Sequence, residues 1–183
     1  MEIVIEIENL VKTFGDTNAV DGVSLKIQQG EIFGLLGPNG AGKTTTLEML
    51  EGLRTPTQGQ ITVLGLGMPD RSSEIKERIG VQLQSSAYFD FLTLREILKL
   101  FGNFYRKHVD VEHLLKLVSL CDKADTLLKK LSGGQKQRFT VAASLVNDPD
   151  LIILDEPTVG LDPIARKSIW DLIRAIHDQK KTI

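Results

Sequence analysis

Residues 37–44 set the tightest limit on the architecture of this chain. They read Gly-Pro-Asn-Gly-Ala-Gly-Lys-Thr and match the phosphate-binding pattern G-x-x-x-x-G-K-[ST]. The glycines let consecutive backbone N–H groups turn toward phosphate oxygens without clashes, and the N-terminus of a following helix adds its dipole. The sequence supplies the context for such a loop, because it predicts a short buried strand over 31–36 and a helix over 43–51.

Strands and helices are mixed early and late in the sequence, with a mainly helical block between them. Alternating or continuous apolar residues predict further strands at 2–8, 23–27, 60–64, 79–83 and 151–154. Further helices are predicted to begin at 94, at 110, at about 134 and at 163. This order predicts an α/β core made of residues 1–84 and 148–183, which carries a helical sub-domain over residues 85–147.

Three of these helices have recognisable start signals. Thr93 and Glu96 form a T-x-x-E capping box, and Asp110 is placed as an N-cap. Asp162 and Pro163 are an N-cap and first-residue pair for the last helix, since proline lacks the N–H that would be unpaired at that position.

The composition excludes several classes of protein. Of the 183 residues, 42% are hydrophobic and 25% are charged, which is typical of a globular domain and not of a disordered chain. The formal net charge is −2, so we expect no nucleic-acid partner. No apolar run reaches the ~18 residues of a membrane helix, and the N-terminus has no secretory signal pattern. The single cysteine, Cys121, is expected to be a small buried side chain and fits a reducing, cytosolic compartment.

Two further motifs carry chemistry. Residues 151–154 form a buried strand that ends in Asp155 and Glu156, at the edge where α/β proteins bind ligands. We expect Asp155 to hold Mg²⁺ directly or through water and Glu156 to orient or deprotonate an attacking water; the alternative is a solvated acidic pair at a strand exit. Residues 131–135 read Leu-Ser-Gly-Gly-Gln, a loop opening a helix and hence a second anion site, where Ser132 can donate to phosphate.

Together the three motifs resemble the ATP-binding cassette family, the nucleotide-binding subunits of ABC transporters. The phosphate loop, residues 131–135 and residues 151–156 occur in the family's order and at compatible spacing. The resemblance covers essentially all 183 residues and implies a P-loop NTPase fold with a mixed sheet core and a helical sub-domain. It also implies ATP as the nucleotide and Mg²⁺ as the metal.

The resemblance assigns roles residue by residue. The nucleotide contacts that it implies are Phe14, Gly37, Pro38, Asn39, Gly40, Ala41, Gly42, Lys43, Thr44, Thr45, Ser132, Gly133, Gly134, Gln135 and Asp162. The implied metal ligands are Thr44, Gln84 and Asp155, and the implied catalytic residues are Glu156 and Gln84. Gln84 matches the Q-loop glutamine, with Gln82 as a neighbouring alternative. Phe14 matches the aromatic side chain that stacks on adenine; the alternative is a core side chain at a strand end.

In the family, two such domains close head to tail around two ATP molecules. Each nucleotide then touches the phosphate loop of one subunit and the Leu131–Gln135 signature of the other, and Asp162 lies in the loop that crosses the interface. The implied partners are ATP, a second ATP-binding subunit in a homodimer or heterodimer, and a membrane permease subunit. The implied location is cytoplasmic, peripheral at the inner face of the cell membrane through the permease.

One departure from the family concerns histidine. The family has a catalytic histidine just after the strand that follows the last helix, and Ile183 stands where that strand should begin. His108, His113 and His177 do not fit this role and are expected to be ordinary surface residues. We therefore expect a C-terminally truncated cassette in which a neighbouring strand edge is uncovered.

The leading functional hypothesis is an ATP-hydrolysing subunit that powers export of an unknown substrate through a separate permease. Residues 44–53 and 81–86 resemble bacterial multidrug-type exporters most. Two alternatives remain open, a soluble ABC ATPase acting in translation or DNA maintenance, and a truncated remnant that does not hydrolyse ATP.

Overall fold

The N-terminal part of the chain forms an antiparallel sheet. In the computed structural model, which describes residues 2–82 and 91–183, its strand order is β2-β1-β3-β4. The bounds are β1 Ile3–Phe14, β2 Thr17–Gln28, β3 Gln58–Val63 and β4 Leu66–Met68. The strands predicted at 2–8, 23–27 and 60–64 are confirmed, and the first two extend into a long hairpin that turns at residues 15–16.

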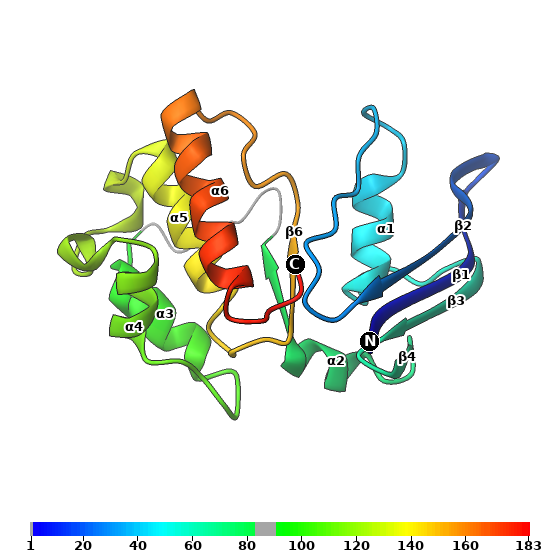
Figure 1. Ribbon diagram of the computed structural model, residues 1–183, viewed down its shortest axis with the longest axis horizontal. Helices are drawn as coiled ribbons and strands as arrows, with labels where there is room; N and C mark the ends of the chain where they lie inside the picture. The colour runs from blue at the N-terminus through cyan, green and yellow to red at the C-terminus, as the bar shows by residue number, and fades with distance from the viewer. Residues whose placement is uncertain (1, 83–90) are drawn as a thin grey trace.

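A pair of parallel strands lies in the middle of the molecule (Figure 1). β5 (Ile79–Gln82) pairs with β6 (Leu151–Leu154), with Ile79 opposite Leu151 and Gln82 opposite Leu154. Both strands are mostly buried, as is usual for parallel strands that are covered on both faces. The predictions for 79–83 and 151–154 therefore place both strands where the structure has them.

The helices lie on both sides of this pair (Figure 1). Their bounds are α1 Lys43–Leu50, α2 Ser72–Arg78, α3 Leu94–Gly102, α4 Val111–Leu117, α5 Gly133–Ala143 and α6 Pro163–His177, with short 3-10 turns at Cys121–Lys123 and Leu128–Lys130. The predicted capping box of Thr93 and Glu96 is present, and Asp110 and Asp162 cap α4 and α6. None of the helices in the described part of the chain is both long and apolar enough to span a membrane.

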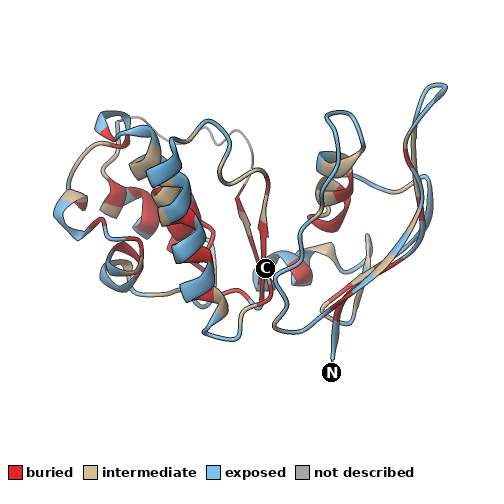
Figure 2. Cartoon of the chain, turned by 45° about the horizontal axis from the view of Figure 1, so that its top comes forward, coloured by how far each residue is buried: buried red, intermediate tan, exposed pale blue. Residues whose placement is uncertain are grey.

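β6 separates two hydrophobic cores. Leu151 and Ile153 belong to the sheet core, which joins the four-stranded sheet to α1, α2 and β5. Ile152, between them, belongs to the helical core formed with α3, α4, α5 and α6. Successive strand residues face opposite sides, so one short strand contributes to both cores. The buried positions accordingly gather on the facing sides of the two halves (Figure 2).

The strand predicted over 31–36 is absent from the structure. Ile32, Phe33 and Leu36 are 44%, 42% and 92% exposed, and the segment has no strand geometry. Within residues 2–82 and 91–183, two backbone bonds join it to another segment, from Phe33 N–H to Ile183 O (2.8 Å) and from Ile183 N–H to Glu31 O (2.9 Å). A strand requires a continuous ladder with a neighbour, and the described residues form none along this segment.

Two side-chain predictions also need correction. Cys121 is exposed, because it opens a 3-10 turn at the surface of the helical half. His177 is half-buried and its Nε2 lies 2.8 Å from Gly30 O, so it ties the end of α6 to the loop after β2. His108 and His113 are exposed, as predicted.

Candidate functional site

The phosphate loop is shaped by glycines that no other residue replaces easily. Gly40 and Gly42 both have φ of 82°, a left-handed conformation that side chains with a Cβ rarely adopt. A Cβ at Gly42 would also lie 2.2 Å from Ala19 O, well inside contact distance. The loop therefore passes directly under the β2 backbone and delivers Lys43 as the first residue of α1.

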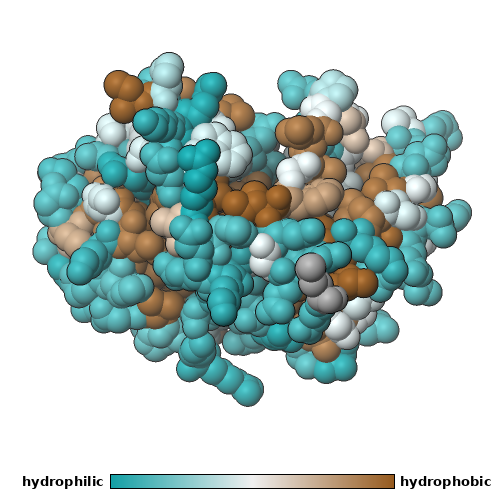
Figure 3. Space-filling model, viewed as in Figure 1, coloured by the Kyte–Doolittle hydropathy of each residue, from teal (hydrophilic) through white to brown (hydrophobic). Residues whose placement is uncertain are grey.

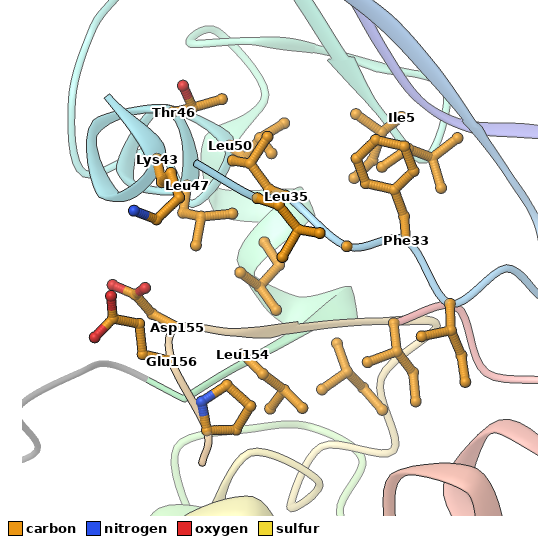
Figure 4. Close-up of a pocket in the computed structure, with 18 of the residues that line it drawn as sticks. Ile5, Phe33, Leu35, Lys43, Thr46, Leu47, Leu50, Leu154, Asp155 and Glu156 are labelled. Carbon is orange, nitrogen blue, oxygen red and sulfur yellow. The ribbon is translucent and has the colours of Figure 1, made fainter. Parts of the chain in front are cut away.

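The charged and hydroxyl groups of the loop point inward. Lys43 Nζ donates to the carbonyl oxygens of Gly37 and Pro38, each at 3.0 Å, so the ammonium group lies within the curve of the loop. The Thr44 hydroxyl donates to Asp155 Oδ2 at 3.3 Å. This contact joins the N-terminus of α1 to the end of β6, and Figure 4 shows Asp155 and Glu156 facing Lys43.

The two carboxylates after β6 differ in their surroundings. Asp155 is buried, and its backbone N–H donates to Gln82 O at 3.1 Å, which extends the β5–β6 ladder. Burial raises the pKa of Asp155, the neighbouring Glu156 charge adds to this, and the hydrogen bond from Thr44 opposes it. Glu156 has φ of 50°, an uncommon conformation for a residue other than glycine, and the backbone turns there out of the strand direction. The solvated-pair alternative therefore does not describe Asp155.

A third carboxylate, Glu51, was missed by sequence reasoning. It follows α1 directly and is only 3% exposed, and its Oε2 has no hydrogen-bond partner among the described residues. Burial, followed by the charges of Asp155 and Glu48, raises the pKa of Glu51 to about 7. The sequence feature that could have identified it is its position, because this acidic residue directly follows Leu50 at the apolar end of the predicted helix.

Phe14 lies at the end of β1 and is 43% exposed, so the core alternative for this residue is wrong. Two cations lie over its ring, with Lys12 Nζ and Arg54 Cζ each 5.3 Å from the ring centroid. Arg54 was not singled out from the sequence, because no local pattern links it to a residue 40 positions earlier. The exposed ring can stack on a flat ligand.

The signature residues lie in the other half of the molecule. Ser132 caps α5, accepting from Gln135 N–H (3.3 Å), while Ser132 N–H donates to Gln135 Oε1 (3.0 Å). Gly134 packs against α6, since a Cβ there would lie 3.1 Å from Ala165 Cβ. β6 lies between α5 and α1 (Figure 1), so the two loops predicted to bind anions are separated within one chain.

The candidate site residues thus fall into separate groups. Gly37, Asn39, Lys43, Asp155 and Glu156 line a single cavity. Asp162 caps α6, accepting from Ile164 and Ala165 N–H, each at 2.9 Å, and lies with the signature half. Gln84 lies outside the described residues. Its neighbour Gln82 is buried at the end of β5.

The donor set around Thr44 fits a magnesium ion. A hydroxyl and a carboxylate oxygen, 3.3 Å apart, are hard ligands of the kind Mg²⁺ prefers. Among the described residues, no group of three or more His, Cys, Asp or Glu side chains forms a metal cage. Such a site relies on substrate phosphate and water for its remaining ligands, which is the usual arrangement for Mg²⁺.

The family is decided by a domain model. The model described as ABC transporter matches residues 20–159, which include the phosphate loop, the signature and the β6 carboxylates. The chain belongs to the ABC transporter family. Among curated relatives, Nod factor export ATP-binding protein I of Burkholderia lata is 46% identical over 184 residues, covering 98% of this chain and 60% of the relative. The protein of the same name from Rhizobium meliloti strain 1021 is 44% identical over 186 residues, covering 99% and 56%.

Solved structures of ABC cassettes have the same fold. A dimeric post-hydrolysis ATP-binding cassette bound to ADP and Pi superposes with a TM-score of 0.85 at 29% identity, covering 97% of this chain and 85% of that one. Another ATP-binding cassette of an ABC transporter superposes with a TM-score of 0.88 at 24% identity, covering 100% and 80%. The expected P-loop NTPase fold of the ABC type is therefore confirmed. The chain spans 60% and 56% of the length of the two curated relatives.

Proposed function

We propose that this chain is the ATP-binding and ATP-hydrolysing component of an ABC exporter that works through a separate membrane permease. The observation that carries the proposal is the 3.3 Å contact between Thr44 and Asp155, which joins the phosphate loop to the two carboxylates after β6. The curated relatives, both named as Nod factor export ATP-binding proteins, support export as the direction.

The phosphate loop and Lys43 bind the nucleotide's phosphates. Backbone N–H groups of residues 37–42 and the N-terminus of α1 favour negative charge. Lys43 already lies inside the loop, and its ammonium can exchange the carbonyl oxygens of Gly37 and Pro38 for β- and γ-phosphate oxygens. Phe14 stacks on the adenine ring, and Lys12 and Arg54 lie near the same aromatic ring.

Thr44 and Asp155 would hold Mg²⁺, with Gln84 as a further ligand implied by the family resemblance. When bound, the ion neutralises charge on the phosphate oxygens. Glu156 lies beside Asp155 and faces Lys43 (Figure 4), which suits it to orient a water and accept its proton during attack on the γ-phosphate.

The signature residues Ser132 to Gln135 serve a second nucleotide. Because they lie on the far side of β6 from the phosphate loop of their own chain, their nucleotide is one held by a second ATP-binding subunit. ATP closes such a dimer only by binding the closed form better than the open one. Asp162, which caps α6 on the same side, belongs to the contact between subunits. The complex would lie at the inner face of the membrane, docked on the permease. With the chain divided at residues 84 and 147, the helical sub-domain between them would transmit closure of the dimer to the permease.

Two variants test the site. Lys43→Ala should weaken Mg-ATP binding by at least about ten-fold, because it deletes the cation that faces the phosphates. Glu156→Gln should leave ATP affinity unchanged and lower phosphate release by about 100-fold. Titration with a fluorescent ATP analogue and a phosphate-release assay measure both, with Lys136→Ala, outside the loop, as the control. Unchanged affinity in Lys43→Ala, or parent-rate turnover in Glu156→Gln, would contradict the assignment.

A further test addresses the transport role. A gene for a membrane permease beside the gene for this chain, and retention of the chain in the membrane fraction only when that permease is present, are expected for an exporter subunit. Identical partitioning with and without the permease would favour a soluble ABC ATPase instead.

A further inference from the structure

A groove lies in the helical half of the molecule, apart from the candidate ATP site. It encloses about 480 Å³ between the end of α4 and one side of α6. Arg138 of α5 also lines it, and α5 packs against both α4 and α6, so the three helices together form one groove. None of the described residues that line it belongs to the phosphate loop, to residues 131–135 or to β6.

The walls of this groove are largely apolar. Leu117 and Val118 line it at the end of α4, and Leu172 lines it from α6. Val118 and Leu172 are buried, so the helical core fixes their side chains. Ile164 also lines the groove and is 83% exposed, which leaves apolar surface in contact with water. Figure 3 shows apolar surface between polar side chains in the helical half, on the left, and an apolar group bound there would be removed from water.

Two cations line the same groove, Arg138 from α5 and Lys167 from α6. Arg138 is half-buried, and Lys167 is exposed. Within the part of the chain that the structure describes, neither side chain makes a hydrogen bond or an ion pair. A half-buried guanidinium without an acceptor is costly, because it has lost part of its hydration and no protein group replaces it. The pair therefore indicates that an anionic group binds here.

The carboxylate at the groove is already paired with another residue. Asp171 lines the groove from α6 and accepts a hydrogen bond from Arg174, three residues further along the helix, at 3.2 Å. Arg174 does not line the groove, so it offsets the charge of Asp171 from outside. The hydroxyls of Ser119 and Ser168 also line the groove and can donate to an anion. The polar lining therefore favours an anion over a cation.

We propose that this groove binds a small amphipathic carboxylate, with its head held by Arg138 and Lys167 and its apolar tail between Leu117 and Leu172. A guanidinium suits the head, because its planar fork matches the two oxygens of a carboxylate. The volume of about 480 Å³ lies within the roughly 300–1,000 Å³ that is usual for small-ligand sites. A protein partner would instead require a surface of about 800 Å² on this chain, well beyond one groove.

Isothermal titration calorimetry at pH 7 with sodium octanoate tests the head and the tail of the ligand separately. Octanoate should bind once per chain with a dissociation constant of about 1 mM or lower, which is ordinary for a ligand of this size. Hexanoate should bind about ten-fold more weakly, because each buried CH₂ contributes about three- to four-fold to affinity. Octylammonium has the same tail and the opposite charge, and it should show no saturable binding.

Two variants remove the cations one at a time. Arg138→Gln and Lys167→Gln should each weaken octanoate binding by about ten-fold, through loss of a charge-assisted hydrogen bond. Lys136→Gln removes an exposed cation of α5 that does not line the groove, and its affinity should equal that of the parent. Because Lys167 is exposed, its variant keeps the test valid even if Arg138→Gln fails to fold.

Three results would overturn the proposal. The first is equal affinity for octanoate and octylammonium, because the cations would then not select the ligand. The second is parent-like octanoate affinity in Lys167→Gln and in every folded Arg138 variant. The third is an octanoate affinity that falls as protein concentration rises, because a second copy of the chain would then cover the groove. These titrations use no nucleotide, so failure here is separate from failure of the ATP site.

Discussion

Replacing Glu51 by glutamine should remove a large pH dependence of stability. The side chain is 3% exposed, and burial with the charges of Asp155 and Glu48 raises its pKa from 4.5 to about 7. Between these values the folded chain binds more protons than the unfolded chain, so the free energy of unfolding falls as pH rises through this window. At ~1.4 kcal/mol per unit, the loss amounts to about 3 kcal/mol, complete slightly above pH 7.

Glutamine stays neutral at every pH in this range. The free energy of unfolding of Glu51→Gln minus that of the parent should therefore rise by about 3 kcal/mol between pH 4.5 and 8. Urea unfolding of both chains at half-unit steps of pH measures this difference. A difference in unfolding free energy that is the same at every pH would come from the packing of the glutamine amide, and it does not change the slope against pH. The exposed Glu8→Gln variant is the control and should run parallel to the parent.

The slope decides whether the reasoning holds. If Glu51→Gln and the parent lose stability in parallel between pH 4.5 and 8, then Glu51 is not a buried carboxyl that must be neutral in the folded chain. The electrostatic link between the end of α1 and Asp155 would then be wrong as well.

Three further predictions test the loop, the cap and the aromatic ring. Gly42→Ala should destabilise the chain by at least about 2 kcal/mol, seen by urea unfolding, because its Cβ meets Ala19 O and its φ is positive. Asp162→Ala should cost about 1 kcal/mol by the same measurement, through loss of the α6 cap, whereas Asp171→Ala on the exposed face of α6 should cost much less. Phe14→Ala should weaken ATP binding by about five-fold in an equilibrium titration while leaving the urea midpoint nearly unchanged.

The parts of the site that could be predicted from the sequence are those specified by residues close together in the chain. The phosphate loop is specified by glycines within eight positions, and the cap of α6 by two neighbouring residues, so neighbours in sequence suffice to identify them. The strand over 31–36 fails for the opposite reason. Its apolar run predicts burial, but Ile32, Phe33 and Leu36 are exposed and the described residues form no continuous ladder along the segment, which no local pattern of apolar residues indicates.

Tertiary contacts explain the other misses. Glu51 is buried in the folded chain, and its charge is disfavoured by this burial and by Asp155, a carboxylate 104 positions away that no short window of sequence contains. Arg54 reaches Phe14 in the same way, across the sheet. Cys121 was expected inside because cysteine is usually buried, yet a short surface turn overrode that preference.

The sharing of β6 between two cores has a consequence for how the molecule comes apart. Leu151 and Ile153 pack in the sheet core, and Ile152 packs in the helical core. Neither half can lose its order without baring one face of a four-residue strand that the other half needs. The three buried side chains of β6 thus couple the stabilities of the two halves, in addition to contacts such as that of His177 with Gly30 O, and Asp155 follows directly at the end of the strand.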